Sequence, residues 1–238
     1  MSNNIDNINS MIAQAREAAA TAAAQVPAAV NSNLPATAAP VTGGRPVSMR
    51  EMVAEAGVRA DHFMKVSPAG FLIGKDTKSF QDELEVEFRL NAAKPYWGLR
   101  FGNPAKYLKS YDRMVDARTK KSWATVIAEC TAADPRCTGD YPALELAFTL
   151  CQDVLAKDGS KLAEKGQTVG WNSSITNWAL WTQFIEPYFN LIDAGIITDN
   201  TLVRGKVIHT QRTKDGNTWG LLDFADFQVV EDQAAQAA

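Results

Sequence analysis

The sequence has few of the residues that build disulfide frameworks, metal sites or phosphate-binding loops. It contains three cysteines (Cys130, Cys137 and Cys151) and two histidines (His62 and His209). An odd number of cysteines is typical of a reducing cytoplasm rather than of a disulfide framework. No pair of these residues has the spacing of a zinc finger, and the glycine motifs of Walker A and dinucleotide-binding loops are absent. We therefore expect no metal, no cofactor and no catalytic residue, and thus no enzyme.

Long hydrophobic runs are also missing. No run approaches the roughly 18 apolar residues that a membrane span needs, and the first residues have neither the basic nor the apolar region of a signal peptide. The 238 residues are 46% hydrophobic and 21% charged, with a net charge of −3. These values predict a soluble, cytoplasmic protein with one large domain or two small ones, and no membrane partner.

Residues 1–47 form a low-complexity arm rich in alanine and proline and poor in large hydrophobic residues. Such a segment buries too little apolar surface to offset the entropy of ordering it. We expect at most a weak, alanine-driven helix over 1–25 and a disordered linker over 26–47. The arm is thus predicted to be a disordered N-terminus.

The folded domain is expected over 48–232, followed by a short tail at 233–238. Ser48-Met-Arg-Glu51 is a capping box and predicts a short helix that Gly57 can end. Phe71-Leu-Ile-Gly74 is a short apolar run that is typical of a strand.

Three longer strands are predicted by alternation of apolar and polar residues. They cover 83–90, 95–103 and 143–151. In the second, Trp97, Leu99 and Phe101 alternate with Tyr96, Gly98 and Arg100.

Two helices and a hairpin complete the predicted domain. Residues 120–133 have a helical pattern, and Asn172-Ser-Ser174 offers an N-cap for a helix over about 174–194, whose stripe of large apolar residues is interpreted as core. Asp215-Gly216 between 202–212 and 219–230 is a strong hairpin signal.

The resulting order is strand, strand, strand, helix, strand, strand. It matches a mainly β fold with helices, namely a five-stranded OB-fold-like barrel with its helix between strands three and four. Residues 104–141 would be an insertion between strands two and three. An α+β sandwich would give the same order and stays an alternative.

Two features point to a binding surface. A two-residue turn at Asp215-Gly216 would place Arg212 opposite Trp219, which makes a stacking platform with a cation beside it. Residues 94–121 carry eight lysines and arginines and two aspartates, so their net charge of +6 stands against −9 for the rest. Tyrosines interleave with these cations, as a groove for a single strand requires. The alternative interpretations are that Trp219 only packs against the rest of the protein and that the basic stretch is a solvated charged face.

Glu83, Glu85 and Glu87 share one face of the first predicted strand. They could hold a divalent ion of a nuclease, although alternate carboxylates on a strand are mostly solvated.

Three segments carry a resemblance to a known family. They are Tyr96-Trp-Gly-Leu-Arg-Phe-Gly-Asn-Pro104, Gly166-Gln-Thr-Val-Gly-Trp171 and Asn217-Thr-Trp-Gly-Leu-Leu-Asp-Phe224. Over roughly 80–230 the chain resembles the OB-fold single-stranded DNA-binding proteins of tailed bacteriophages. The resemblance implies sequence-tolerant binding of single-stranded DNA in phage replication or recombination, in the cytoplasm of the host cell.

The candidate nucleic-acid-binding residues are Tyr96, Arg100, Lys106, Tyr107, Lys109, Tyr111, Arg113, Lys120, Lys121, Arg204, Lys206, Arg212, Lys214 and Trp219. Candidate partners are single-stranded DNA, further copies of the chain and phage replication proteins. The alternative function is a phage virion structural protein, such as a decoration or tail component, whose arm serves assembly.

Overall fold

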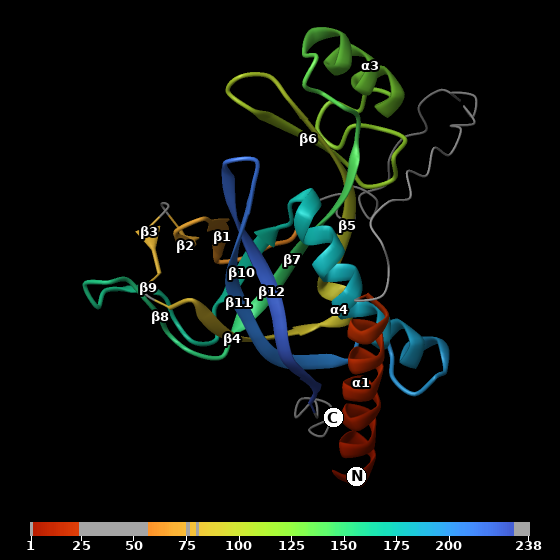
Figure 1. The fold of residues 1–238 in the computed structure, drawn as a ribbon, viewed down its shortest axis with the longest axis vertical. Helices are drawn as coiled ribbons and strands as arrows, with labels where there is room; N and C mark the ends of the chain where they lie inside the picture. The colour runs from red at the N-terminus through yellow and green to blue at the C-terminus, as the bar shows by residue number, and fades with distance from the viewer. Residues whose placement is uncertain (1, 24–56, 75–76, 80, 231–238) are drawn as a thin grey trace.

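The fold was analysed in a computed structural model, which describes residues 2–23, 57–74, 77–79 and 81–230 (Figure 1). Its helices are α1 (Ser2–Ala23), the 3-10 helix η1 (Leu90–Ala92), α3 (Trp123–Ala133) and α4 (Ile175–Asp193). Its strands are β1 (His62–Ser67), β2 (Gly70–Ile73), β3 (Thr77–Lys78), β4 (Glu83–Arg89), β5 (Ala93–Phe101), β6 (Lys106–Ser110), β7 (Tyr141–Leu150), β8 (Val154–Leu155), β9 (Lys161–Ala163), β10 (Thr168–Asn172), β11 (Leu202–Lys214) and β12 (Asn217–Val229).

One large mixed sheet dominates the molecule, as the mainly β prediction required. Its strands follow the order β12-β11-β4-β7-β10-β1-β2-β3, and β5 and β6 join through β7. β1 and β10 pair in parallel, and the other strand pairs of this sheet are antiparallel. β8 and β9 form a separate two-stranded sheet. The structure thus confirms a mainly β protein with a few helices.

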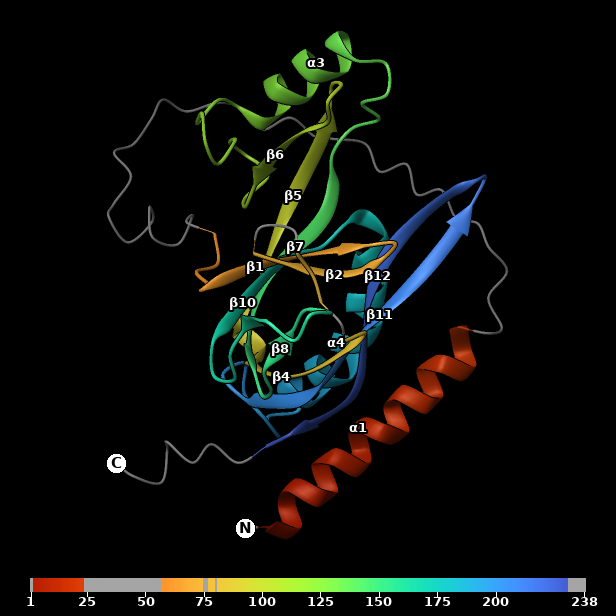
Figure 2. The ribbon, with the colours of Figure 1, turned by 90° about the vertical axis from the view of Figure 1, so that its left-hand side faces the viewer.

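The strand predicted over 83–90 forms as the alternation indicates. Leu84, Val86 and Phe88 of β4 are buried in the main core, while the intervening glutamates face the other side. After η1 the chain continues as β5, so that β4 and β5 run along the same side of the long strand β7. This arrangement places β5, β6 and the first half of β7 in a unit that projects from the main sheet together with α3 (Figure 2).

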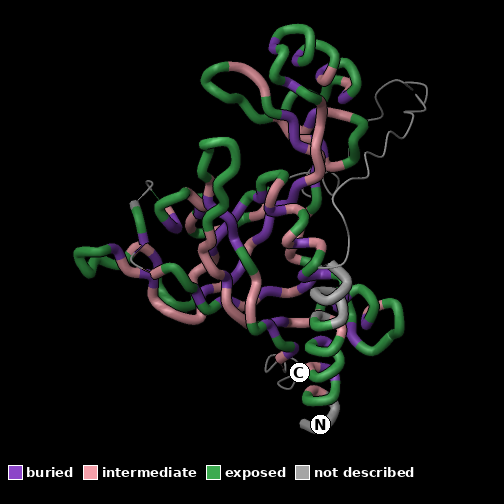
Figure 3. The backbone as a smooth tube through the Cα atoms, viewed as in Figure 1, coloured by how far each residue is buried: buried purple, intermediate pink, exposed green. Residues whose placement is uncertain are grey.

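Two cores follow from this arrangement. The main core lies between the sheet and α4, and Figure 3 shows buried residues along the central strands. The second core lies between β5, β6 and α3, where Leu99 packs with Trp123, Val126, Cys130 and Cys137. The projecting unit therefore has its own apolar support.

The sheet is not closed into a barrel, because β12 and β3 are the two ends of its path of paired strands. The predicted order is also interrupted, since β8, β9 and β10 separate β7 from α4. These strands and β6 were not predicted. The five-stranded OB-fold-like barrel stays a prediction.

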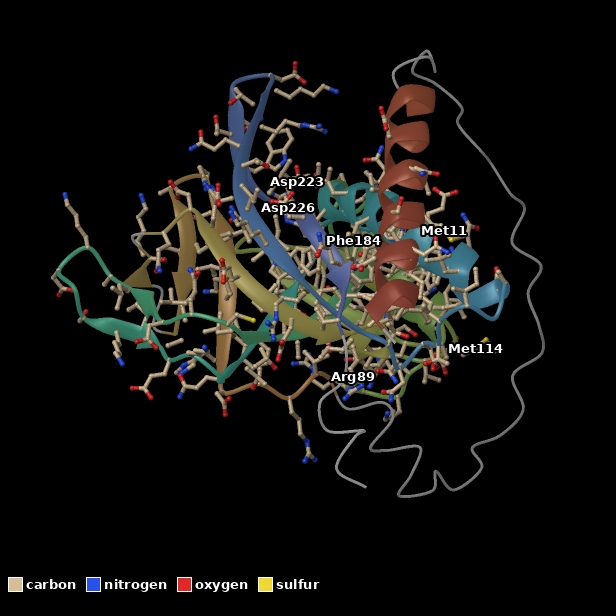
Figure 4. All side chains as sticks on the ribbon, turned by 90° about the horizontal axis from the view of Figure 1, so that it is seen from below. Met11, Arg89, Met114, Phe184, Asp223 and Asp226 are labelled. Carbon is tan, nitrogen blue, oxygen red and sulfur yellow. The ribbon has the colours of Figure 1, made fainter. Side chains whose placement is uncertain are left out.

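The helix predicted over 174–194 is confirmed as α4, and both of its ends have the expected chemistry. The Ser174 hydroxyl accepts a hydrogen bond from the Asn177 backbone N–H. At the other end Gly195 adopts a φ of 69°, and the Ile196 N–H donates to the Leu191 carbonyl, which is the Schellman pattern. Phe184 of α4 stacks on Phe224 of β12 with ring centroids 4.7 Å apart, and Figure 4 shows it in the interior beside the hairpin.

The helix expected over 1–25 forms as α1, but its packing was not expected. α1 lies against α4 and β12, and Ile8 and Ile12 are buried in the main core. The Asn9 side chain pairs with the backbone of Val229, accepting from its N–H at 2.8 Å and donating to its carbonyl at 3.3 Å. The expectation that the arm lacks residues for the core was therefore wrong for Ile8 and Ile12.

Three other sequence predictions lie outside the described residues. They are the linker over 26–47, the helix that begins at Ser48 and the tail at 233–238. The domain boundaries at 48 and 232 stay predictions.

Candidate nucleic-acid interface

The two faces of β5 have opposite characters. Trp97, Leu99 and Phe101 pack beneath α3, as the sequence pattern predicts for apolar residues of one parity. Tyr96 and Arg100 alternate with them and belong to the opposite face. The strand thus separates a supporting core from an aromatic and cationic surface.

Neighbouring strands extend this surface. Tyr107 lies opposite Arg100, while Lys109 of β6 and Tyr141 of β7 both lie opposite Gly98. We define the tyrosine face by the residues Tyr96, Arg100, Tyr107, Lys109, Tyr111 and Tyr141. Tyr107 is 61% exposed and Arg100 is exposed as well, so the outer part of the face is open to a ligand.

Glycine at position 98 makes room for one of these rings. A Cβ atom at Gly98 would lie 2.9 Å from the Tyr141 ring, which is closer than real Cβ contacts. The missing side chain therefore lets Tyr141 lie flat across β5.

Ring and ammonium groups contact one another on this face. The Lys109 ammonium lies 4.7 Å from the Tyr96 ring centroid, and the Lys94 ammonium lies 4.6 Å from that of Tyr111. Tyr96 and Tyr111 meet edge to face at 6.2 Å. These contacts hold the rings of Tyr96 and Tyr111 in place at the base of the tyrosine face.

Glu145 of β7 lies at the inner end of the tyrosine face. Its residue exposure is only 5%. One carboxylate oxygen accepts a hydrogen bond from Lys109 Nζ at 2.5 Å, and the other accepts from the Val58 backbone N–H at 2.9 Å. The carboxylate is thus held by a cation of the face and by the chain segment before β1.

Burial makes the inner tyrosines weak acids. Desolvation raises the pKa of Tyr96, with the charges of Tyr141 and Glu145 adding to the effect. Desolvation likewise raises the pKa of Tyr111, followed by the charge of Glu145 and a hydrogen bond to it. Burial also raises the pKa of Tyr141. The phenols of these three residues therefore stay protonated to a higher pH than that of an exposed tyrosine.

The rest of the basic stretch does not join the tyrosine face. The Arg113 guanidinium lies 3.9 Å from the Trp97 ring centroid and pairs with Asp140 at 3.0 Å, and Lys106 lies over Phe101; both rings face α3. Lys121 pairs with Glu129 of α3 at 3.2 Å.

Lys120 lies in the loop before α3, where its backbone has a φ of 61° and its N–H donates to the Asp116 carbonyl. The cations of residues 94–121 are thus divided between two sides of the projecting unit.

The β11–β12 hairpin has the predicted register. Asp215 and Gly216 have φ angles of 52° and 76° and form the two-residue turn, and Arg212 pairs with Trp219 across it. Lys214 is exposed at the tip. Trp219 is half-buried, and its Nε1 atom is buried without a hydrogen-bond partner.

Arg204 and Lys206, at the base of the same hairpin, are engaged by glutamates of β4. Arg204 Nη2 lies 2.6 Å from the Glu87 carboxylate, and Lys206 Nζ lies 3.2 Å from that of Glu83. This pairing explains the acidic face of β4. In the described part of the chain no group of three or more His, Cys, Asp or Glu side chains is placed to hold a metal ion.

The sequence reasoning missed three residues of the candidate surface, namely Lys94, Tyr141 and Glu145. Tyr141 and Glu145 have the same parity in β7, opposite to the apolar residues that were used to predict that strand. The same alternation that predicts the strand also predicts that Tyr141 and Glu145 lie together on its second face. Lys94 belongs to the basic stretch 94–121, and its place on the candidate surface follows from the contact of its ammonium with the Tyr111 ring.

Comparisons with models of known families, with curated proteins and with solved structures found no match. No helix among the described residues is long and apolar enough to cross a membrane.

Proposed function

We propose that the protein binds single-stranded DNA with little sequence preference. The tyrosine face carries the proposal. It presents Tyr107 and Arg100 opposite each other on an open sheet surface, with further rings behind them. Aromatic faces stack on any base, and neighbouring cations attract the phosphate backbone, which is how single strands are bound without base readout.

The β11–β12 hairpin offers a second contact. Its tip and the β5–β6 unit project toward the same end of the molecule (Figures 1 and 2), and Arg212 and Lys214 are exposed there. Each stacked base is worth about 1–3 kcal/mol. If one DNA strand contacts both the tyrosine face and the hairpin, its affinity would exceed that of either contact alone.

An OB-fold-like barrel is retained as part of this proposal. A Cβ atom at Gly220 of β12 would lie 2.2 Å from the Ser67 carbonyl oxygen, so the β1–β2 turn lies directly on the hairpin. His209 Nε2 is 2.8 Å from the same oxygen, and Gln211 donates to the Pro68 carbonyl. These contacts bring strands of the two ends of the sheet together, which supports a barrel-like curvature. We place the activity in phage replication or recombination, in the host cytoplasm.

Titration with an unstructured oligothymidylate tests the proposal. Fluorescence anisotropy in about 50 and 200 mM salt should show binding that weakens as salt rises, with log K falling by about 0.7 per unit of log salt for each phosphate neutralised. Tyr107→Ala should weaken binding by about 1–3 kcal/mol. Met114→Ala is the control, because Met114 is also exposed, at 58%, but has neither an aromatic ring for a base nor a charge for a phosphate. Absence of binding at low salt, or equal affinity of the two variants, would contradict the proposal.

The docking of α1 favours a second candidate function, a phage virion structural protein. A helix that docks on β12 through Asn9 and two isoleucines can dock in the same way on a neighbouring copy. The two candidates differ in the titration, since a virion component would assemble without binding oligothymidylate.

A further inference from the structure

The pair formed by Lys109 and Glu145 bears on which polyanions the tyrosine face accepts. Lys109 was predicted to contact phosphate. Its ammonium is instead bound to the Glu145 carboxylate at 2.5 Å and to the Asn172 side-chain oxygen at 3.0 Å. The cation nearest the Tyr96 ring is therefore already neutralised within the protein.

Several contacts hold Glu145 in this position. The Val58 N–H donates to its second oxygen, and the hydrogen bond with Tyr111 engages the carboxylate as well. A Cβ atom at Gly57 would lie 2.8 Å from the same carboxylate, so the chain passes close over it. A carboxylate with so many partners is costly to displace.

The charges across the face are consequently uneven. Arg100 is exposed toward its open end, among the described residues it has no ion-pair partner, and the aromatic ring of Tyr107 lies opposite it. At the inner end the charge of Lys109 is cancelled by Glu145, and Lys94, over the Tyr111 ring, is a second cation there. The exposed ring of Tyr107 is thus available to a base, whereas the attraction for phosphate comes from Arg100 and Lys94 and not from Lys109.

We propose that Glu145 is a specificity-determining residue that makes binding depend on bases. Glu145 withholds Lys109 from phosphate, so that a strand depends on stacking against the exposed ring of Tyr107, and a polyanion without bases binds weakly. This inference rests on the proposed function. The expected ligand is a polyanion that carries planar bases, and polyanions without bases are expected to bind less tightly.

The test compares oligothymidylate with an abasic oligonucleotide of the same length. Wild-type protein should prefer the base-bearing strand. Glu145→Gln keeps an oxygen for the Val58 N–H but frees the charge of Lys109. It should raise the affinity for the abasic strand by about fivefold, raise that for oligothymidylate less, and add about 0.7 to the magnitude of the salt slope.

Glu129→Gln is the control, because it frees Lys121 on the α3 side from an exposed lysine–glutamate ion pair. It should leave the ratio of the two affinities unchanged. The double variant Glu145→Gln/Lys109→Gln removes both charges and keeps a side-chain amide pair. It should return both affinities to within about twofold of wild type, because Lys109 does not contact phosphate in the wild-type protein.

The outcomes separate the two proposals. Wild-type protein that binds neither strand contradicts the proposed function itself. Wild-type protein that binds both strands equally, or a Glu145→Gln variant with the wild-type affinity ratio, overturns the role of Glu145. If the single variant does not give a cooperative thermal transition, the double variant decides. Loss of oligothymidylate binding in the folded double variant would show that Lys109 contacts phosphate after all.

Discussion

At the scale of single residues, Trp219 combines a surface position with a buried polar atom. Trp219 pairs with Arg212 across the projecting hairpin, while its buried Nε1–H has no hydrogen-bond partner. A buried N–H without a partner costs stability, about 1–3 kcal/mol. Any stabilising or binding contribution of Trp219 therefore comes from its aromatic ring and not from its N–H group.

Substitution of Trp219 should separate the two roles of the side chain. Trp219→Phe removes the unpaired N–H and keeps an aromatic face, so we expect an unchanged or higher melting temperature and only a modest loss of oligothymidylate affinity. Trp219→Ala should lower the free energy of unfolding by about 1–2 kcal/mol and weaken binding by about 1–3 kcal/mol. Thermal melting and anisotropy on the same samples measure both. If Trp219→Ala melts much lower yet binds as tightly per folded molecule, the residue belongs to the core and not to the interface.

The orientation of the β5 residues could be predicted from the sequence, because alternation fixes which side chains share a face. Trp97 and Phe101 face α3, and Tyr96 and Arg100 face away from it. The burial of Tyr96 could not be predicted. It depends on contacts with Tyr111 and with Lys109, which are set by the path of the chain and not by local pattern.

At the scale of elements, the Asn9 side chain forms two hydrogen bonds between α1 and β12. Asn9→Ala leaves the N–H and carbonyl of Val229 without their partner, so the free energy of unfolding should fall by about 1–2 kcal/mol. Gln14→Ala is the control, because Gln14 is exposed and bonds only to Ser10 of its own helix. Urea denaturation of both variants measures the difference. Equal midpoints for the two variants would show that α1 contributes nothing to stability through this contact.

The backbone N–H of Val58 helps to hold the segment before β1, together with the hydrogen bonds between Asp61 and Thr168. Val58→Pro removes the donor to Glu145, and since hydrogen bonds to charged groups are worth about 1.5–3 kcal/mol, we expect a loss of that order in unfolding free energy. Val58→Ala keeps the N–H and is expected to cost less than 1 kcal/mol, because Val58 is only half-buried. Similar denaturation curves for the proline and alanine variants would argue against a role for the N–H.

Elements with local signals were predictable, and those that depend on distant partners were not. The cap at Ser174, the stop at Gly195 and the turn at Asp215-Gly216 each rest on a few adjacent residues, and all three form. β10 has only five residues and pairs with β1 and β7, far away in the chain. The docking of α1 was missed because two isoleucines in an alanine-rich segment form too short an apolar stripe to signal burial.

At the scale of the whole molecule, the buried phenols predict alkaline unfolding. Burial raises the pKa of Tyr96, Tyr111 and Tyr141 above the ordinary value of about 10. In the unfolded chain these groups lose their protons first, so stability is complete below about pH 10 and falls as the pH rises above it.

Absorbance of phenolate and circular dichroism, followed together from pH 8 to 13 in steps of about half a unit, should show these three tyrosines ionising only as the structure is lost. Tyr111→Phe removes one of the groups and should move the midpoint to higher pH. Ionisation of all five tyrosines near pH 10 with an intact spectrum would instead show that the tyrosine face is open to solvent.

The pairing of Asn9 with Val229 also has a consequence for the order in which the protein is made. The two residues are 220 positions apart, and closing a loop of that length costs about 5 kcal/mol by the (3/2)RT ln n relation. At synthesis rates of about 5–20 residues per second, α1 waits roughly ten to forty seconds for the strand that receives it. Throughout that time the Asn9 side chain lacks the Val229 backbone with which it pairs. α1 is thus synthesised long before the strand that pairs with Asn9, and a chain interrupted before β12 would leave Asn9 without this partner.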